Sequence, residues 1–172
     1  MNNLTQYQKL QEKYWKQLCQ FKFDLLYYDL HFRKCVMIGR FIKIIGAIMT
    51  SFATGAWMGW NHIGWVRIVC PIVIFVLQAM NAGYQFFPFE DRKIELRELI
   101  EKLEPIYYRI EYDWDQVAEG SCTKEKIRKL IYGNVQEITQ EKSRYFRNDS
   151  LPQNKRITQK AKAITDNYFK NF

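Results

Sequence analysis

Three uncharged amide side chains are the residues of this chain best placed to act on a solute. Gln78, Asn81 and Gln85 follow one another at intervals of three and four residues, so one face of an α-helix would carry all three. In an apolar helix, such amides either hydrogen-bond to a neighbouring helix or line a water-filled path. The spacing therefore predicts a polar stripe that faces either a conduit or a seam between subunits, and both alternatives stay open.

A cluster of carboxylates is the second group of residues that could do chemistry. The segment EYDWDQ contains Glu111, Asp113 and Asp115, and Glu111 and Asp115 would share a helix face on which a divalent cation could bind. The chain has no phosphate-binding glycine loop and no GxSxG elbow, and its two histidines and four cysteines lack metal-ligand spacing. We therefore predict that the protein is not an enzyme and has no metal site and no cofactor.

Two long uncharged runs must position the amide stripe. One extends from Ile44 to Val66 and the other from Ile68 to Phe89, with Arg67 between them. Each exceeds the roughly 20 apolar residues that a helix needs to cross a bilayer. We predict a transmembrane helical hairpin that turns around Trp60–Arg67, with Pro71 in the first turn of its second helix. The alternative is a buried helical hairpin in a soluble protein.

The residues that flank the hairpin predict its orientation. Cations gather before the first run and after the second run, at Arg33, Lys34, Arg40, Lys43, Arg92, Lys93 and Arg97. Because positive charge near a membrane stays cytoplasmic, both termini are predicted to be cytoplasmic. Trp57, Trp60 and Trp65 cluster near the turn, where indole rings would anchor it at the outer interface.

The first apolar run carries a face of small residues. Ala47, Ser51, Gly55 and Gly59 recur every fourth residue. Small residues at this spacing allow helix backbones to approach closely, and serine adds an interhelical hydrogen bond. This face is predicted to pack either on the second helix of the hairpin or between subunits.

Outside the hairpin the chain is predicted to be helical throughout. Residues 1–43 form an amphipathic cytoplasmic helix that leads into the membrane, residues 44–89 the hairpin, and residues 90–172 a cytoplasmic helical bundle, with Pro105 expected to end or kink a helix. Apolar residues at helical spacing mark five faces: Leu4, Tyr7, Leu10, Tyr14, Leu18, Phe21, Leu25, Tyr28 and Phe32; Leu96, Leu99, Ile100 and Leu103; Tyr107, Ile110, Trp114 and Val117; Ile127, Ile131, Val135 and Ile138; Ile157, Ala161, Ile164 and Tyr168. We expect the first of these faces to pack against the C-terminal helices; an oligomerisation face or a membrane-surface helix is the alternative.

Charge is distributed unevenly along the 172 residues, which have a formal net charge of +8. Residues 90–119 contain ten acidic and five basic residues, whereas residues 124–172 contain twelve basic and five acidic residues. The basic C-terminal part is suited to RNA, anionic lipid or an acidic partner. It is equally suited to neutralising the acidic segment of its own chain or of a neighbouring subunit.

The order of these features resembles a known group of proteins. An amphipathic helix leads into two closely spaced apolar runs, which exit through FFPFEDRKIELRELIEKLEP into charged helices. This arrangement resembles the SLATT-type two-transmembrane effectors of bacterial antiviral systems, and among these it is similar to the small membrane accessory proteins of type VI-B CRISPR systems.

The resemblance implies a homo-oligomeric pore, or depolarising effector, in the bacterial inner membrane. Its partners would be other copies of the chain, membrane lipid and an RNA-guided RNA-cleaving effector complex or RNA. The alternative is a membrane-anchored adaptor that binds RNA or a protein partner through its basic C-terminal helices.

Overall fold

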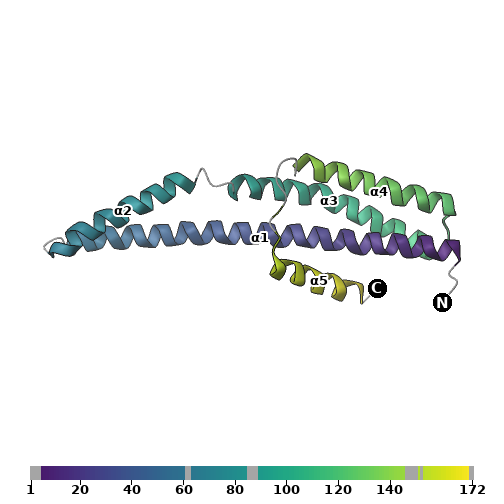
Figure 1. Ribbon diagram of the computed structural model, residues 1–172, viewed down its shortest axis with the longest axis horizontal. Helices are drawn as coiled ribbons and strands as arrows, with labels where there is room; N and C mark the ends of the chain where they lie inside the picture. The colour runs from purple at the N-terminus through teal and green to yellow at the C-terminus, as the bar shows by residue number, and fades with distance from the viewer. Residues whose placement is uncertain (1–4, 61–62, 85–88, 146–150, 152, 171–172) are drawn as a thin grey trace. The chain divides into compact units, whose positions relative to one another are not determined.

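Five α-helices make up the regular secondary structure of the described residues in this computed structural model (Figure 1). They are α1 (Gln6–Trp60), α2 (Gly64–Tyr84), α3 (Phe89–Ala118), α4 (Lys124–Tyr145) and α5 (Lys155–Phe169). The structure describes residues 5–60, 63–84, 89–145, 151 and 153–170, without the side chains of 50, 53–54, 56–60, 66, 77, 80–84 and 89–91. The prediction of an all-α protein is confirmed.

The first helix is 55 residues long and continues without a break into the first apolar run. Its start is stabilised by a reciprocal cap. The backbone N–H of Gln8 donates to the Thr5 hydroxyl over 3.3 Å, and the backbone N–H of Thr5 donates to the Gln8 side-chain carbonyl over 2.8 Å. This exchange satisfies two backbone donors at the helix start. The expectation that the amphipathic helix passes straight into the first run is confirmed.

The chain divides into two compact units. Unit 1 combines Met1–Phe32 with Glu95–Phe172, and unit 2 is Arg33–Ile94. The sequence-based boundaries, at residues 43 and 89, separated the N-terminal helix from the C-terminal bundle. The structure instead joins them in unit 1, because the N-terminal half of α1 supplies part of the core shared with α3 and α4.

The core of unit 1 is built from the predicted apolar stripes. On α1, the residues Tyr14, Leu18, Phe21 and Leu25 have at most 9% of their surface exposed. They pack in one cluster with buried residues of α3 and α4, namely Leu99, Leu103, Ile106, Tyr107, Ile110, Val117, Ile127, Ile131 and Ile138. Each fully buried side chain of this size contributes roughly 1.5–3 kcal/mol. The expected packing of the N-terminal helix on the C-terminal helices is therefore observed.

Helix α3 continues through Pro105, so this proline does not end the helix; that it kinks the helix, the other expectation, stays a prediction. Proline removes one backbone hydrogen bond from a helix interior. Pro105 lies on the exposed side of α3, where water can satisfy the freed carbonyl group, while Leu103 and Ile106 on either side are buried. The apolar contacts on both sides therefore hold the helix together across the proline.

In two of the predicted buried faces, the neighbouring polar residue is buried in place of one predicted apolar residue. On α4, Asn134 is buried whereas Val135 is 48% exposed. On α5, Thr165 is buried whereas Ile164 is 39% exposed. Both buried polar side chains have hydrogen-bond partners: the Thr165 hydroxyl donates to the carbonyl of Ala161 over 2.9 Å, and Asn134 donates to a tyrosine of α1.

Unit 2 contains the C-terminal part of α1 and helix α2. Because α1 extends to Trp60 and α2 begins at Gly64, the connection is shorter than the predicted turn. Pro71 lies inside α2 and not in its first turn, because the helix starts seven residues before it. Among the described residues, none of the helices combines enough length with enough apolar character to cross a membrane.

Candidate functional site

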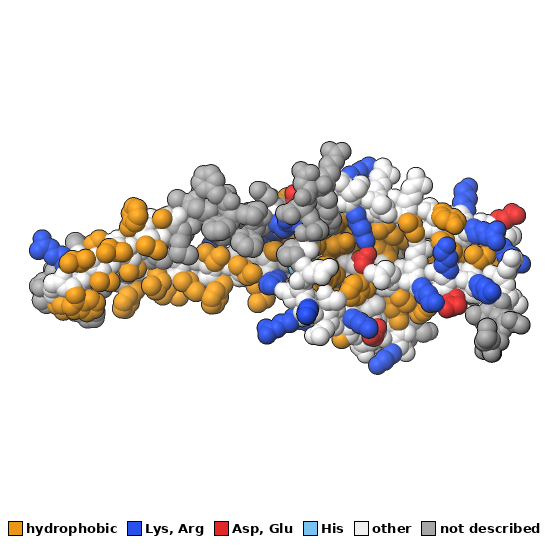
Figure 2. Space-filling model, viewed as in Figure 1, with side chains coloured by type: hydrophobic (Ala, Val, Ile, Leu, Met, Phe, Trp, Pro, Cys, Tyr) orange, Lys and Arg blue, Asp and Glu red, His pale blue; other side chains and the backbone are white. Residues whose placement is uncertain are grey.

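Unit 2 exposes a stripe of large apolar side chains along α1. Met37, Phe41, Ile44, Ile48 and Phe52 follow one another at steps of three or four residues, and each has 58–70% of its surface exposed. In Figure 2, hydrophobic side chains, drawn in orange, gather along the unit 2 part of α1 and along α2. Contiguous apolar surfaces of this kind mark interaction sites in folded proteins.

Helix α2 presents a second apolar surface. Trp65, Ile68, Ile72 and Phe75 have 56–71% of their surface exposed, and Val76 has 49%. The side chain of Trp65, one of the three predicted interface anchors, is thus exposed. The side chains of Trp57 and Trp60 lie outside the described residues.

Cations border this apolar surface. Arg40 and Lys43 are exposed on α1 before the first uncharged run, and Arg67 is exposed near the start of α2. Between Lys43 and Arg67 the sequence has no acidic or basic residue apart from a histidine. The part of the apolar surface of α1 from Ile44 onward therefore lies between charged positions, whereas Met37 and Phe41 precede Lys43.

The predicted amide stripe is described only in part. Gln78 lies on α2 and its side chain is exposed. Asn81 belongs to the same helix, but its side chain lies outside the described residues, as does the whole of Gln85. Whether the three amides meet at a common surface stays a prediction.

The small-residue face of α1 is open in the single chain. Ala47, Ser51 and Gly55 are exposed, and a Cβ atom added to Gly55 would meet no other atom within 4 Å. The hydroxyl of Ser51 donates to the carbonyl of Ala47 over 2.9 Å, so this hydroxyl bonds within its own helix. Gly59 lies in α1, and its surroundings are outside what the structure describes.

A polar cluster in unit 1 joins three helices. The carboxylate of Glu111 accepts hydrogen bonds from the hydroxyls of Tyr107 over 2.6 Å and Tyr168 over 2.7 Å. The ammonium of Lys22 lies 4.3 Å from the ring centre of Tyr107 and 4.0 Å from that of Tyr168. Burial lowers the pKa of Lys22, although Glu111 and another carboxylate oppose the shift. Burial, with the hydrogen bond to Glu111, raises the pKa of both tyrosines.

This cluster gives Glu111 a structural role. Its carboxylate bonds to side chains of α3 and α5, so the cation that Glu111 and Asp115 were considered to bind would compete with two tyrosine hydroxyls. The described residues contain no group of three or more possible metal ligands. Sequence reasoning did not identify the cluster, although the spacing of Tyr107 and Glu111, one helical turn apart, was a signal for the first hydrogen bond.

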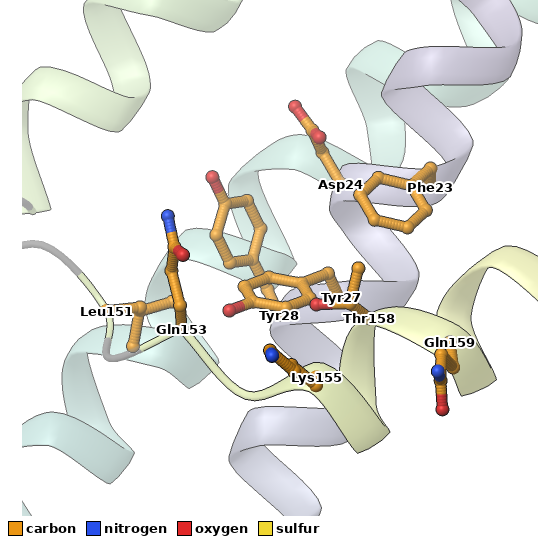
Figure 3. A pocket seen from close by; sticks show the side chains of 9 residues that line it. All are labelled: Phe23, Asp24, Tyr27, Tyr28, Leu151, Gln153, Lys155, Thr158 and Gln159. Atoms are coloured by element: carbon orange, nitrogen blue, oxygen red, sulfur yellow. The ribbon is translucent and has the colours of Figure 1, made fainter.

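A pocket of about 670 Å³ lies between α1 and the beginning of α5. Figure 3 shows the side chains that line it: Phe23, Asp24, Tyr27, Tyr28, Leu151, Gln153, Lys155, Thr158 and Gln159. Asp24 forms an ion pair with Lys142 of α4, whose ammonium lies 5.6 Å from the ring centre of Tyr28. Burial lowers the pKa of Lys142, but the carboxylate of Asp24 and the hydroxyl of Tyr28 together outweigh that effect and raise the pKa overall.

Helix α5 packs on α1 beside two pockets. A second pocket, of about 650 Å³, shares Phe23 and Thr158 with the first and also lies between α1 and α5. Helix α5 packs on its own chain through the buried Ala161 and Thr165, and near its C-terminal end Phe169 packs edge-on against Trp15 with ring centres 4.9 Å apart.

No family model, curated protein or solved structure matches this chain. The family resemblance drawn from the order of its segments therefore stays a prediction. The features that bear on function are the exposed apolar surface of unit 2 and the charged faces of unit 1.

Proposed function

We propose that the protein is a homo-oligomeric membrane protein whose unit 2 inserts into a lipid bilayer and forms a pore. The observation that carries this proposal is the exposed apolar surface of unit 2. Thirteen large hydrophobic side chains between Met37 and Val76 have 40% or more of their surface exposed.

The size of this surface requires a cover. Burying the exposed part of each side chain gains roughly 1 kcal/mol, so the whole surface corresponds to a free energy on the order of 10 kcal/mol. That is comparable to the net stability of an entire domain. A surface of this size left in water would favour aggregation, so we infer that lipid or another subunit covers it.

Lipid is the better cover for most of this surface. The exposed apolar residues occupy more than one face of each helix, since Ile45 and Met49 accompany Ile44 and Ile48 on α1, and Val69 accompanies Ile68 on α2. A helix that is apolar on several faces is typical of a membrane environment. The uncharged runs of the sequence also extend into residues whose side chains are not described.

Contacts between subunits account for the remaining features of unit 2. Ala47, Ser51 and Gly55 are open on α1, which favours close packing against a helix of another copy over packing on α2. A two-helix unit has too few helices to shield Gln78, Asn81 and Gln85 by itself, so these amides would face a conduit in the assembled oligomer.

The resemblance to SLATT-type effectors suggests when such a pore would act. The protein would depolarise the inner membrane of a bacterium during phage infection, with both termini in the cytoplasm. Its partner would be an RNA-guided RNA-cleaving effector complex.

A dye-release assay tests the pore. The purified full-length protein is reconstituted into liposomes that contain a self-quenched fluorophore, and its incorporation is measured by flotation. We expect release from wild-type liposomes and loss of release for Gln78→Leu at equal incorporation. Phe75→Leu, a conservative change on the same helix, is the matched control and should release dye normally. Wild-type protein that does not float with the liposomes, or Gln78→Leu protein that releases as much dye as wild type, would refute the proposal.

A membrane-anchored adaptor is the second candidate function. The observation that favours it is the exposed positive charge of the C-terminal helices, including Arg128 and Lys129 on α4 and Arg156 and Lys160 on α5. Exchanging residues 44–89 for an unrelated hairpin discriminates between the two functions, because an adaptor should keep its activity after the exchange and a pore should lose it.

A further inference from the structure

Helix α3 carries an exposed stripe of acidic and aromatic side chains. We call it the acidic stripe; it consists of Glu101, Glu104, Tyr108, Tyr112 and Asp115 on α3 and of Glu119, which directly follows the helix. Steps of three or four residues place these side chains on one face of α3. Tyr108 and Tyr112 at its centre are 64% and 65% exposed, although Tyr107 of the same helix is buried.

Most carboxylates of the acidic stripe form no ion pair within the described part of the chain, although Glu104 attracts Lys22 of α1 electrostatically. Glu101 pairs with Arg97 one turn earlier on α3. Glu104, Asp115 and Glu119 form no ion pair with any described residue. Within the described part of the chain, ion pairs with the positive C-terminal helices therefore do not neutralise these three carboxylates; for the acidic segment as a whole, neutralisation within one chain stays a prediction.

Helix α5 presents the opposite chemistry on its outer side. We call this surface the basic face; it consists of Arg156, Lys160, Ala163 and Asn167, all exposed. Arg156 and Lys160 form no ion pair with any described residue. The inner side of α5 is committed to its own chain through the buried Ala161 and Thr165 and through the bond between Tyr168 and Glu111.

We propose that the acidic stripe of one copy binds the basic face of α5 in a second copy. The proposal rests on the homo-oligomer proposed above and names a contact between its subunits outside unit 2. Two different surfaces would meet, so the contact is heterologous, and repeating it generates a ring if the rotation closes.

Charge complementarity within a single sequence identifies the partner as another copy. The acidic stripe lies in a segment with ten acidic and five basic residues, and the basic face lies in one with twelve basic and five acidic residues. The exposed rings of Tyr108 and Tyr112 would supply the apolar centre of the contact, since tyrosine is enriched among the residues that dominate interface energetics. Arg156 and Lys160 would meet the carboxylates around that centre.

Photocross-linking of the full-length, detergent-purified protein tests this contact. A photoreactive phenylalanine replaces Tyr112, copies with natural and heavy nitrogen are mixed before illumination, and cross-linked peptides are identified by mass spectrometry. We expect peptides of mixed isotope composition that join residue 112 to residues 156–167. The yield should fall severalfold in about 1 M salt, because exposed charge pairs are screened.

Charge reversal supplies the decisive comparison. Either Glu104→Lys with Asp115→Lys, or Arg156→Glu with Lys160→Glu, should lower the intermolecular yield about tenfold, and combining the two sets should restore it to within about twofold. Circular dichroism tests whether each variant is folded. If the variant with Glu104→Lys and Asp115→Lys is not folded, the neutral pair Glu104→Gln and Asp115→Asn replaces it, and the cross-linking yield should fall about threefold. Lys124→Glu with Arg128→Glu on α4 makes the same change of charge elsewhere and should leave the yield unchanged.

Three outcomes would overturn the proposed contact: a cross-link confined to one copy, a cross-link to another helix, or failure of the combined variant to recover. These outcomes are separate from failure of the pore. Dye release with no cross-link between residue 112 and α5 refutes only this contact, whereas the expected cross-link without dye release refutes only the pore.

Discussion

Replacing Tyr14 by phenylalanine tests the buried polar link between three helices of unit 1. Tyr14 of α1 is fully buried, and its hydroxyl donates to the carbonyl of Ile110 on α3 over 3.1 Å. The same hydroxyl accepts a hydrogen bond from the side-chain amide of Asn134 on α4 over 3.3 Å. Phenylalanine keeps the ring and its apolar contacts, so only these two hydrogen bonds are lost.

The expected loss of stability follows from the groups that the substitution leaves without a hydrogen-bond partner. A hydrogen bond in a folded protein contributes about 1 kcal/mol net, and a buried polar group left without a partner costs about 1–3 kcal/mol. The carbonyl of Ile110 lies inside helix α3, whereas the amide of Asn134 loses its acceptor. We therefore expect Tyr14→Phe to destabilise the protein by about 2–3 kcal/mol, which lowers the Tm of a chain of this size by about 5–10 °C.

A double-mutant cycle measures the link itself. Asn134→Leu removes the amide, and the double variant removes both partners, so it should be more stable than the sum of the two single effects predicts, by about 1–2 kcal/mol. Thermal unfolding of the full-length protein in detergent, followed by circular dichroism, provides the values. Tyr112→Phe on the exposed side of α3 is the control and should change the Tm little. Single effects that add to within about 0.5 kcal/mol would refute the reasoning, because independent sites are additive at that level.

Three further predictions concern pH, helix capping and the apolar surface. Burial raises the pKa of Tyr107, so above about pH 10 this tyrosine ionises in the unfolded chain while it stays neutral in the folded protein. The stability of the protein should therefore fall as the pH rises above about 10, and it should fall less steeply for Tyr107→Phe. The lowered pKa of Lys22 acts on stability in the opposite direction. The hydroxyl of Thr123 accepts the backbone N–H of Lys126 over 3.2 Å at the start of α4, so Thr123→Ala should cost about 1 kcal/mol and lower the Tm by about 2–4 °C. Ile48→Lys places a charge in the exposed apolar surface and should reduce flotation with liposomes at least severalfold, whereas Val135→Lys on α4 should float like wild type.

Each of these predictions has a result that contradicts it. A Tm that falls as steeply for Tyr107→Phe as for wild type between about pH 9 and 11 would show that ionisation of Tyr107 is not linked to folding. A Thr123→Ala variant as stable as wild type would show that water replaces the cap. Equal flotation of Ile48→Lys and wild type would place this side chain away from lipid.

The helical class and most of the buried faces of this protein follow from its sequence. The spacing of Tyr14, Leu18, Phe21 and Leu25 is a local property of one helix, and these residues form the core wherever that helix packs. The continuity of α1 is equally local, because no proline interrupts residues 6–60 and the reciprocal cap at Thr5 lies within four residues. The cap formed by Thr123 at the start of α4 was recognisable for the same reason.

Tertiary structure alone decided which polar residues enter the core. Asn134 and Val135 are both compatible with a helical stripe between Ile131 and Ile138, and the choice depends on the position of the Tyr14 hydroxyl, which comes from another helix. Pro105 stays inside α3 because the apolar residues on both sides of it pack against helices distant in sequence.

The same distinction applies to the charged groups. Sequence identified the acidic segment and the basic segment, but only the arrangement of α3 and α5 shows that Glu111 is turned inward to two tyrosines, whereas Glu104 and Asp115 remain exposed. A local pattern determines which side chains share a helix face. Which face is covered depends on contacts between segments far apart in the chain, and these contacts form only when the helices pack together.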